Sequence, residues 1–330
     1  MSLLEVSNLS TSFHIGVGDV QAVRGVSFHV ESGESLGIVG ESGSGKSVSM
    51  LSVLGLLPDY AEVRADAIRF DGRDLTKLSG KALRAMHGSE IGMIFQDPMT
   101  SLNPLFTVES QLTEPLKIHM HLNKKQARAR ALALLEQVEI PNPEARLRQY
   151  PHELSGGLRQ RVMIAIAIAC NPKMIIADEP TTALDVTIQA QILELLRHLK
   201  EETRTAVIMI THDLGVIASM CSRIMVMYGG TVCEEGGVRE IFYDPRHPYT
   251  WGLLNSIPRA GNGPREKLIP INGTPPDMLR PPEGCPFAPR CRYAMPVCRA
   301  HMPPVTRLSD TLSLACHLMP PKAPQITREV

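Results

Sequence analysis

Residues 40–47 read GESGSGKS and match the pattern G-x-x-x-x-G-K-[ST] at every fixed position. The stretch SLGIVG before this loop is typical of a short strand, and the stretch SVSMLSVLGLL after it is compatible with a helix. The glycines let backbone N–H groups turn inward, and the N-terminal end of the following helix adds positive potential at the same place. The stretch therefore predicts a phosphate-binding loop in an α/β fold.

A nucleoside triphosphate is the ligand that such a loop predicts. We expect Lys46 to bridge the β- and γ-phosphates, and the Ser47 hydroxyl to join the coordination shell of a Mg²⁺ ion. The full set of loop residues expected to bind ATP is Gly40, Glu41, Ser42, Gly43, Ser44, Gly45, Lys46 and Ser47.

The remainder of the chain supports the same fold class. Residues 3–75 have the pattern of short strands punctuated by glycine, and the pattern from about 97 to 170 is helical. In ARARALALLEQVEI, for example, Ala131, Leu134, Leu135 and Val138 recur at helical spacing. Strands and helices then alternate to about residue 240, which predicts a mainly parallel sheet.

Composition excludes several classes of protein. The 330 residues carry a formal net charge of zero, and only 4% are aromatic, so no basic field or set of stacking platforms for nucleic acid is expected. The longest purely apolar run, residues 162–170, is about half of a membrane span. The N-terminus MSLLEVSNLS lacks the features of a signal peptide. We therefore expect a cytoplasmic protein that reaches a membrane through its partners.

A phosphate loop alone binds a nucleotide, whereas hydrolysis also needs a metal ligand and a residue that places water. Both are expected in MIIADEPTTALD, where Asp178 ends an apolar strand and is suited to Mg²⁺, and Glu179 is suited to orient or deprotonate water. His212 directly follows another strand, TAVIMI, and ligands gather at such strand ends in α/β sheets. We predict catalytic roles for Glu179 and His212.

The ordered set GESGSGKS, IFQDP, LSGGLRQR, MIIADEP, TALD and THD resembles the nucleotide-binding subunit of ATP-binding cassette (ABC) transporters over roughly residues 3–250. This resemblance implies a RecA-like core, an antiparallel β subdomain and a helical subdomain at about 97–170. It also implies a head-to-tail dimer in which the LSGG loop of each subunit closes over the ATP held by the other. The signature-loop residues expected to act on the partner's ATP are Leu154, Ser155, Gly156, Gly157 and Gln160.

Three further roles follow from the resemblance alone. Gln96 is expected to contact Mg²⁺ and the attacking water, and so joins Glu179 and His212 among the catalytic residues. Asp185 is expected to reach across the dimer seam. Phe13 is expected to stack on the adenine.

Three stretches, QDPMTSLNP, DPRHPYT and a cysteine-bearing tail, resemble the ATPases of peptide and nickel importers, the dipeptide/oligopeptide group. This resemblance divides the chain into an ABC domain, residues 1–255, and a proline-rich, cysteine-rich C-terminal extension, residues 256–330. It implies three kinds of partner: a second, homologous ABC ATPase, two integral-membrane permeases, and a periplasmic or lipid-anchored substrate-binding protein. The expected place is the cytoplasmic face of the bacterial inner membrane, and the transported solute stays open.

Four cysteines of the extension are spaced Cys285-x5-Cys291-x6-Cys298-x17-Cys316. Zinc ribbons use shorter spacings, and disulfides are disfavoured in the cytoplasm. Four thiolates can hold an iron–sulfur cluster, and the resemblance implies a 4Fe-4S cluster at these cysteines. Structural zinc is the alternative, with His301 and His317 nearby in the sequence.

Taken together, these features predict an ATPase subunit that powers import of peptides or related solutes. The alternative is a soluble ABC-class ATPase that acts on nucleic acid or on ribosomes. Such proteins usually carry two cassettes in one chain or a long coiled-coil insertion, and the sequence has neither. A regulatory ATP sensor without turnover is a third reading, which the intact Glu179 and His212 disfavour.

Overall fold

The computed structural model describes residues 2–182, 184–256 and 270–318. These residues form two compact units. The first comprises Lys77–Ile210, Val30–Ser35 and the residues before Leu4, and the second comprises Leu4–His29, Leu36–Thr76 and the described residues from Thr211 onward. Chain segments distant in sequence therefore meet within each unit.

The first unit contains a parallel sheet with the strand order β9-β8-β7. Its strands are β7 (Ile91–Ile94), β8 (Met174–Asp178) and β9 (Ala206–Ile210). All residues of β8 and β9 are buried, which matches the continuous apolar runs MIIAD and AVIMI. Because the strands are parallel, their carboxyl ends lie at one edge of the sheet, with Ile94 beside Ala177 and Asp178 beside Ile210.

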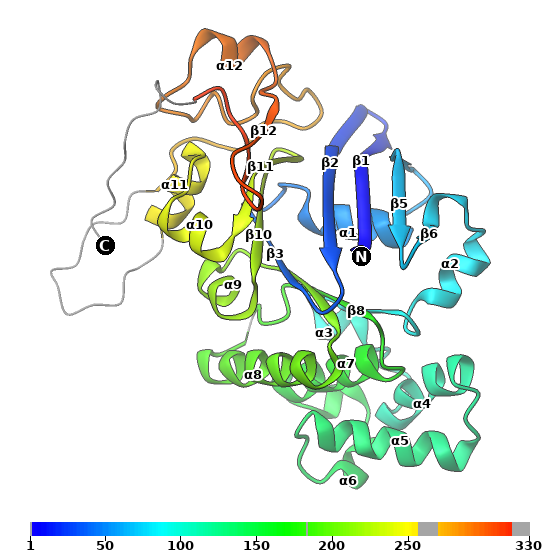
Figure 1. The fold of residues 1–330 in the computed structure, drawn as a ribbon. Helices are drawn as coiled ribbons and strands as arrows, with labels where there is room; N and C mark the ends of the chain where they lie inside the picture. Colours follow the sequence, from blue (N-terminus) through cyan, green and yellow to red (C-terminus); the bar gives the residue numbers. More distant parts are fainter. Residues whose placement is uncertain (1, 183, 257–269, 319–330) are drawn as a thin grey trace, which may run out of the picture. The chain divides into compact units, whose positions relative to one another are not determined.

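Helices make up most of the rest of the first unit, and α4, α5, α6 and α7 pack together in it (Figure 1). The predicted periodicity of residues 127–140 is confirmed, because Ala131, Leu134, Leu135 and Val138 are all fully buried. The helices are α2 (Gly80–Met86), α3 (Pro98–Ser101), α4 (Val108–His119), α5 (Lys124–Gln137), α6 (Pro143–Leu147), α7 (Gly156–Ile168), α8 (Val186–Thr203) and the 3-10 helix η2 (Pro151–Glu153).

The second unit contains an antiparallel sheet with the order β2-β1-β5-β6, in which β4 also pairs with β1 (Figure 1). Two of its strands run for 14 residues, longer than the short strands predicted. The stretch AIRFDGRDL forms β5 and β6, which are joined at Asp71 and Gly72, both with positive φ. The bounds are β1 (Ser2–Ile15), β2 (Gly18–Glu31), β4 (Ala61–Arg64), β5 (Ala67–Phe70), β6 (Arg73–Asp74) and the 3-10 helix η1 (Leu75–Lys77).

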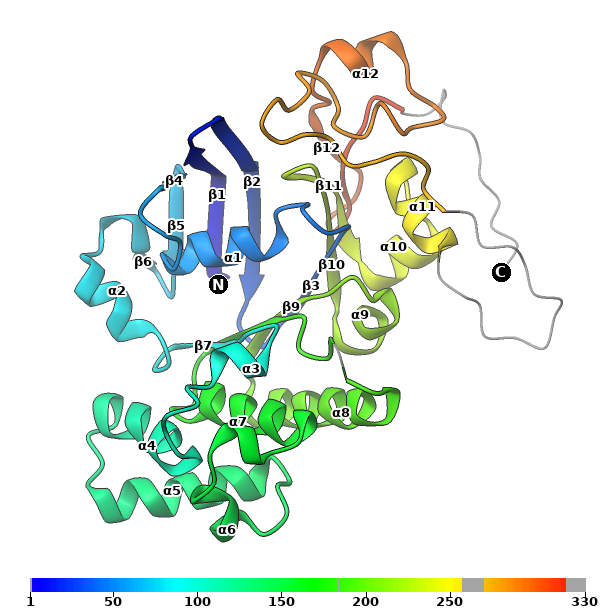
Figure 2. The ribbon, with the colours of Figure 1, turned by 180° about the vertical axis from the view of Figure 1, so that it is seen from behind.

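The other strands of the second unit follow the order β12-β13-β11-β10-β3, in which only β3 and β10 are parallel neighbours. They are β3 (Ser35–Val39), β10 (Arg223–Tyr228), β11 (Thr231–Gly237), β12 (Val305–Arg307) and β13 (Ser313–Ala315). The helices are α1 (Lys46–Leu54), α9 (Leu214–Met220), α10 (Val238–Tyr243), α11 (Pro248–Asn255) and α12 (Pro296–Ala300), which Figure 2 shows from behind. The C-terminal extension thus adds two strands to the sheet of this unit through β11 and β13.

A buried aromatic cluster holds the extension against the rest of the second unit. The ring of Tyr228 lies 4.6 Å from that of Tyr249 between centroids, and Phe287 of the extension packs on both, at 5.2 and 5.3 Å. Aromatic side chains bury large apolar areas, so this cluster is a core element for the extension.

His247, from the stretch DPRHPYT, is buried at the start of α11 with an exposed fraction of 1%. The ring Nδ1 of His247 accepts a hydrogen bond from the backbone N–H of Tyr249 at 3.0 Å. The backbone N–H of His247 donates a hydrogen bond to the Glu234 carboxylate at 3.1 Å. Burial lowers the pKa of His247 from 6.5 to about 3, because the charged ring loses its hydration. The ring is therefore neutral in the folded chain at neutral pH.

This histidine predicts a loss of stability in mild acid. The unfolded chain takes up a proton at this position below about pH 6.5, whereas the folded chain does so only near pH 3. The stability present above pH 6.5 is therefore lost as the pH falls toward 3, by up to about 1.4 kcal/mol per pH unit. The variant His247→Asn keeps a cap acceptor without the titrating ring, so its free energy of unfolding should fall less steeply between pH 6.5 and 4.5 in urea titrations.

The exposed His121 supplies the control for this experiment, since its positive φ also tolerates asparagine. The variant His121→Asn should keep the slope of the native chain. Parallel stability profiles for His247→Asn and the native chain would contradict the role given to the buried ring.

Candidate functional site

The phosphate loop adopts the conformation that its glycines predict. Gly40 follows β3 with φ 156°, and a Cβ built there would lie 2.2 Å from the carbonyl oxygen of Met227. Gly45 precedes α1 with φ 95°, and a Cβ there would lie 2.5 Å from the carbonyl oxygen of Ala22. Because glycine brings no capping side chain, the N-terminus of α1 is suited to bind an anion such as phosphate.

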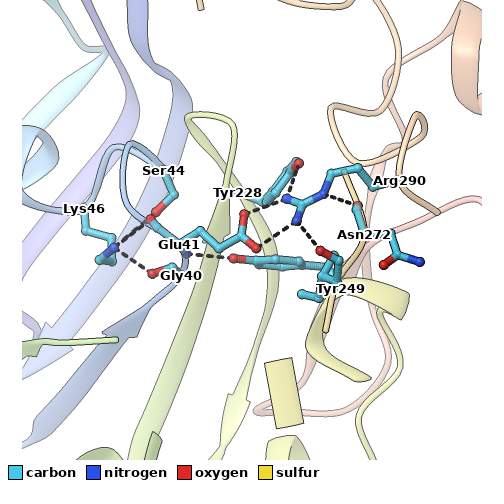
Figure 3. A network of polar contacts seen from close by, with 9 residues as sticks. Gly40, Glu41, Ser44, Lys46, Tyr228, Tyr249, Asn272 and Arg290 are labelled. Atoms are coloured by element: carbon cyan, nitrogen blue, oxygen red, sulfur yellow. Dashed lines mark hydrogen bonds and ion pairs between the residues drawn. The ribbon is translucent and has the colours of Figure 1, made fainter. Parts of the chain in front are cut away.

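The side chain of Lys46 is buried. Figure 3 shows its contacts with Gly40 and Ser44 of the loop. Its Nζ donates hydrogen bonds to the carbonyl oxygens of Gly40 at 2.7 Å and Glu41 at 2.9 Å, and contacts Ser44 Oγ at 3.5 Å. The loop thus forms a closed ring around one ammonium group. That positive charge is available to bind phosphate oxygens.

Two predicted catalytic residues of the first unit are in direct contact. Gln96 follows β7 and Glu179 follows β8, and these parallel neighbours end at the same edge of the sheet. Gln96 Nε2 donates to Glu179 Oε2 at 3.1 Å, and Thr182 Oγ1 donates to the same oxygen at 2.8 Å. Glu179 has a φ of 46° and donates its N–H to the Ile210 carbonyl at 2.8 Å. The carboxylate is therefore held by two side chains while its backbone is fixed by β9.

The other predicted residues are distributed over both units. Asp178 is the last residue of β8 and is 6% exposed. In the second unit, His212 is exposed and follows the buried Thr211, and Ser47 lies in the first turn of α1. Phe13 lies in β1 beside Tyr60, with 6.0 Å between the ring centroids. The hydroxyl and carboxylate oxygens of Ser47 and Asp178 are the donor types that Mg²⁺ prefers.

The structure brings the signature loop and Asp185 together in the first unit. Ser155 caps α7 by accepting a hydrogen bond from the Leu158 N–H, and Asp185 caps α8 by accepting one from the Ile188 N–H at 2.9 Å. Both caps, with Gly156 and Gly157, line one surface depression of about 470 Å³. An exposed depression with two helix N-termini at its wall is suited to receive an anionic group from outside the chain.

Two of the predicted signature-loop residues, Leu154 and Gln160, are buried and do not line that depression. Gln160 is 1% exposed and donates to the Pro180 carbonyl oxygen at 2.6 Å, and Leu154 is 4% exposed. Their contact with a partner's ATP stays a prediction. Arg161, which the sequence reasoning missed, lines the depression and donates to Val138, Glu139 and Gln191. Its place inside LSGGLRQR was the available signal.

The predicted 4Fe-4S cluster and its zinc alternative are wrong. In residues 270–318, as in the rest of the described chain, no group of three or more His, Cys, Asp or Glu side chains is placed to hold a metal ion. Burial raises the pKa of Cys285 to about 11 and that of Cys316 to about 12, which favours the neutral thiol over the thiolate that metals bind. Cys298 Sγ and Cys316 Sγ instead accept backbone hydrogen bonds, and His317 contacts the His301 carbonyl oxygen.

Residue spacing along the chain does not fix where side chains point, and this is why the cysteine pattern misled. The four cysteines carry free thiols, as do the three scattered ones. The extension is therefore not confirmed as a cluster-bearing segment. Backbone pairing through β13 and the packing of Phe287 order it instead.

Comparison with known proteins adds to this geometry. Residues 23–182 match the family described as "ABC transporter", and residues 233–298 match "Oligopeptide/dipeptide transporter, C-terminal region". Over 98% of its length, the chain is 54% identical to the oligopeptide transport ATP-binding protein OppD of Bacillus subtilis (strain 168), of which it covers 91%. The chain belongs to the ABC transporter family.

Further relatives and solved structures agree with this assignment of the ABC ATPase. The chain is 50% identical to the dipeptide transport ATP-binding protein DppD of Escherichia coli (strain K12), over 96% of this chain and 97% of that relative. A dimeric ATP-binding cassette in a post-hydrolysis state, bound to ADP and Pi, matches with a TM-score of 0.64 and 30% identity over 72% of this chain and 99% of that one. The predictions of an α/β phosphate-loop fold and of an ATPase subunit are confirmed. The relatives support the transporter and not the nucleic-acid alternative.

Proposed function

We propose that this ABC ATPase hydrolyses ATP to power import of peptides or related solutes. One observation carries the proposal: the similarity to oligopeptide and dipeptide transport proteins covers nearly the whole chain and includes the C-terminal region. A motor shared with unrelated transporters would be expected to match in its phosphate-loop core alone. The substrate class therefore rests on the match over residues 233–298.

The site residues receive the following roles in this proposal. The loop of residues 40–47 binds the ATP phosphates with Lys46, and Phe13 stacks on the adenine. Ser47, Asp178 and Gln96 would hold Mg²⁺, which supplies charge neutralisation on the phosphates when it is bound. Glu179, held by Gln96 and Thr182, accepts a proton from the attacking water. His212 contacts the γ-phosphate and completes the catalytic set.

A second, homologous ABC ATPase subunit completes the mechanism. Ser155, Gly156 and Gly157 bind the γ-phosphate of the ATP that the partner holds, and Asp185 contacts the partner across the dimer seam. The depression that these residues line supports this role, because it is open and has the N-termini of α7 and α8 in its wall. ATP bound in two such shared sites closes the dimer, and hydrolysis lets it open.

The permease partners dock on the first unit, on a surface that we call the 99–106 patch. It consists of Met99, Leu105 and Phe106, whose exposed fractions are 63, 80 and 51%. Exposed apolar groups close together in sequence mark a site of protein contact. They follow Gln96 directly along the chain, so a change at the nucleotide is transmitted over few residues to the permease helices.

Because the permeases lie in the membrane, we place this subunit at the cytoplasmic face of the bacterial plasma membrane. A periplasmic or lipid-anchored substrate-binding protein delivers the solute to the permeases. Among the described residues, no helix combines the length and the apolar character needed to cross a bilayer. Attachment to the membrane is then a property of the complex, through the permeases.

The variant Leu105→Glu tests the docking surface. A charge in place of an 80% exposed leucine should leave the fold and ATP binding unchanged, because the side chain packs little within the chain. Its burial against an apolar permease surface would be costly. We expect the amount of permease that co-purifies from detergent-solubilised membranes to fall at least about tenfold.

Val305→Glu is the matched control, because Val305 is 72% exposed and lies in β12 of the other unit. It should retain the permeases. Equal recovery of permeases with Leu105→Glu and the native chain would refute docking at the 99–106 patch, and the absence of hydrophobic permeases from the native preparation would refute the importer assignment itself.

A further inference from the structure

The phosphate loop carries a carboxylate, Glu41, next to its first glycine. A carboxylate beside bound triphosphate is unfavourable, because like charges repel most strongly where water is partly excluded. The side chain of Glu41 is only 26% exposed, so solvent screens it incompletely. The loop therefore needs a positive group that neutralises this residue.

Arg290 of the C-terminal extension supplies that group (Figure 3). Its side chain is 6% exposed and binds Glu41 through two hydrogen bonds, 2.6 Å from Nη1 to Oε2 and 3.1 Å from Nη2 to Oε1. The two residues are 249 positions apart in the sequence. A buried, bidentate arginine–carboxylate ion pair combines charge-assisted hydrogen bonds with a specific planar geometry.

The remaining donors of Arg290 fix the guanidinium in place. Nη1 also donates a hydrogen bond to Tyr228 Oη at 3.0 Å. Nη2 donates to the Ile271 carbonyl oxygen at 3.0 Å, and Nε donates to the Asn272 carbonyl oxygen at 2.8 Å. Arginine has five N–H donors, and these contacts use all of them. A lysine has three donors and no planar fork, so it cannot reproduce the arrangement.

Glu41 is held at its backbone as well as at its side chain. Its N–H donates to Tyr249 Oη at 2.8 Å, and its carbonyl oxygen accepts from Lys46 Nζ at 2.9 Å. The ion pair with Arg290 adds the third point of attachment. Three groups from separate chain segments thus determine the position of one loop residue.

We propose that Arg290 is a positioning residue for ATP binding, through which the C-terminal extension neutralises Glu41 and holds the phosphate loop in its binding conformation. The proposal rests on the assignment of residues 40–47 as the ATP-binding loop. It gives the extension a direct effect on nucleotide affinity that needs no metal.

The experiment is a titration of the full chain with a fluorescent ATP analogue and Mg²⁺, compared across variants. Arg290→Met leaves Glu41 charged and uncompensated, so its Kd for the analogue should rise about tenfold. The double variant Glu41→Gln with Arg290→Met removes the uncompensated charge and should recover most of that loss. In steady-state hydrolysis, Arg290→Met should raise KM while kcat at saturating ATP stays near that of the native chain.

Arg292→Met is the matched control, since Arg292 is an exposed arginine of the same segment. It should bind the analogue as the native chain does. Unchanged affinity in Arg290→Met, or a double variant as weak as the single one, would overturn the proposal and reduce Arg290 to a structural contact. If Arg290→Met does not fold, Arg290→Gln takes its place, because it also removes the positive charge while its amide can still donate hydrogen bonds. Native affinity in that variant would overturn the proposal as well. A native chain that does not bind the analogue would instead contradict the assignment of the loop.

Discussion

Glu179→Gln is expected to lower the rate of ATP hydrolysis by ~10²–10⁴-fold and to leave ATP binding intact. Glutamine keeps the size of the side chain, and its carbonyl oxygen can still accept a hydrogen bond from Thr182 Oγ1. It cannot take a proton from water. With hydrolysis blocked, ATP should hold the closed dimer, so the variant mixed with its partner subunit should elute as a dimer in the presence of ATP and Mg²⁺, and transport should stop.

Glu201→Gln is the control, because Glu201 is an exposed glutamate of α8 in the same unit. Phosphate release should be close to the native rate in that variant. A Glu179→Gln protein that imports solute at the native rate would show that another group serves as the general base.

Gly156→Val is expected to reduce hydrolysis by ~10²-fold in the assembled complex, the loss typical when a group that binds the reacting oxygens is removed. A Cβ at Gly156 meets no atom within 4 Å in the chain, so valine should not disturb the fold. Its branches would occupy the space that the partner's triphosphate needs against the Ser155 cap. ATP binding to the isolated variant, measured by titration, should be unchanged, whereas ATP-dependent dimer formation should be lost.

Gly80→Val provides a close match in the same unit. Like Gly156, Gly80 is exposed and is the first residue of a helix that a serine, Ser79, caps. A Cβ built at Gly80 likewise meets no atom within 4 Å. It should hydrolyse ATP normally. Native turnover by Gly156→Val, or by the native chain diluted until no pairing occurs, would refute a composite site.

The part of the site that the sequence predicted well is made of local geometry. At positions 40 and 45 the loop requires glycine, because a Cβ at either would collide with a backbone oxygen. The glycines of the motif therefore indicate the loop conformation. Gln96 and Glu179 meet because parallel strands end at one edge of a sheet. The apolar run before Glu179 indicated one of these strands, β8, whereas β7 before Gln96 was not predicted. Local patterns of this kind carry over into three dimensions with few alternatives.

The parts that failed depend on long-range packing. Nothing in the loop motif indicates that Glu41 pairs with a residue 249 positions later, and the spacing of four cysteines does not reveal that their thiols lack a metal-binding arrangement. The signature-loop role of Gln160 stays a prediction, and its side chain donates to the Pro180 carbonyl oxygen. The division into residues 1–255 and 256–330 stays a prediction, while the compact units follow other boundaries.

The packing of Phe287 against Tyr228 and Tyr249 limits how this protein can be recombined with others. A chimera that joins the first 255 residues to a foreign tail would leave two large rings without their covering ring, and the new surface would favour aggregation. Exchange of the tail therefore requires a donor with an aromatic residue at the equivalent place. The segment around Phe287 is therefore not a detachable module, because its packing completes the core beside the phosphate loop.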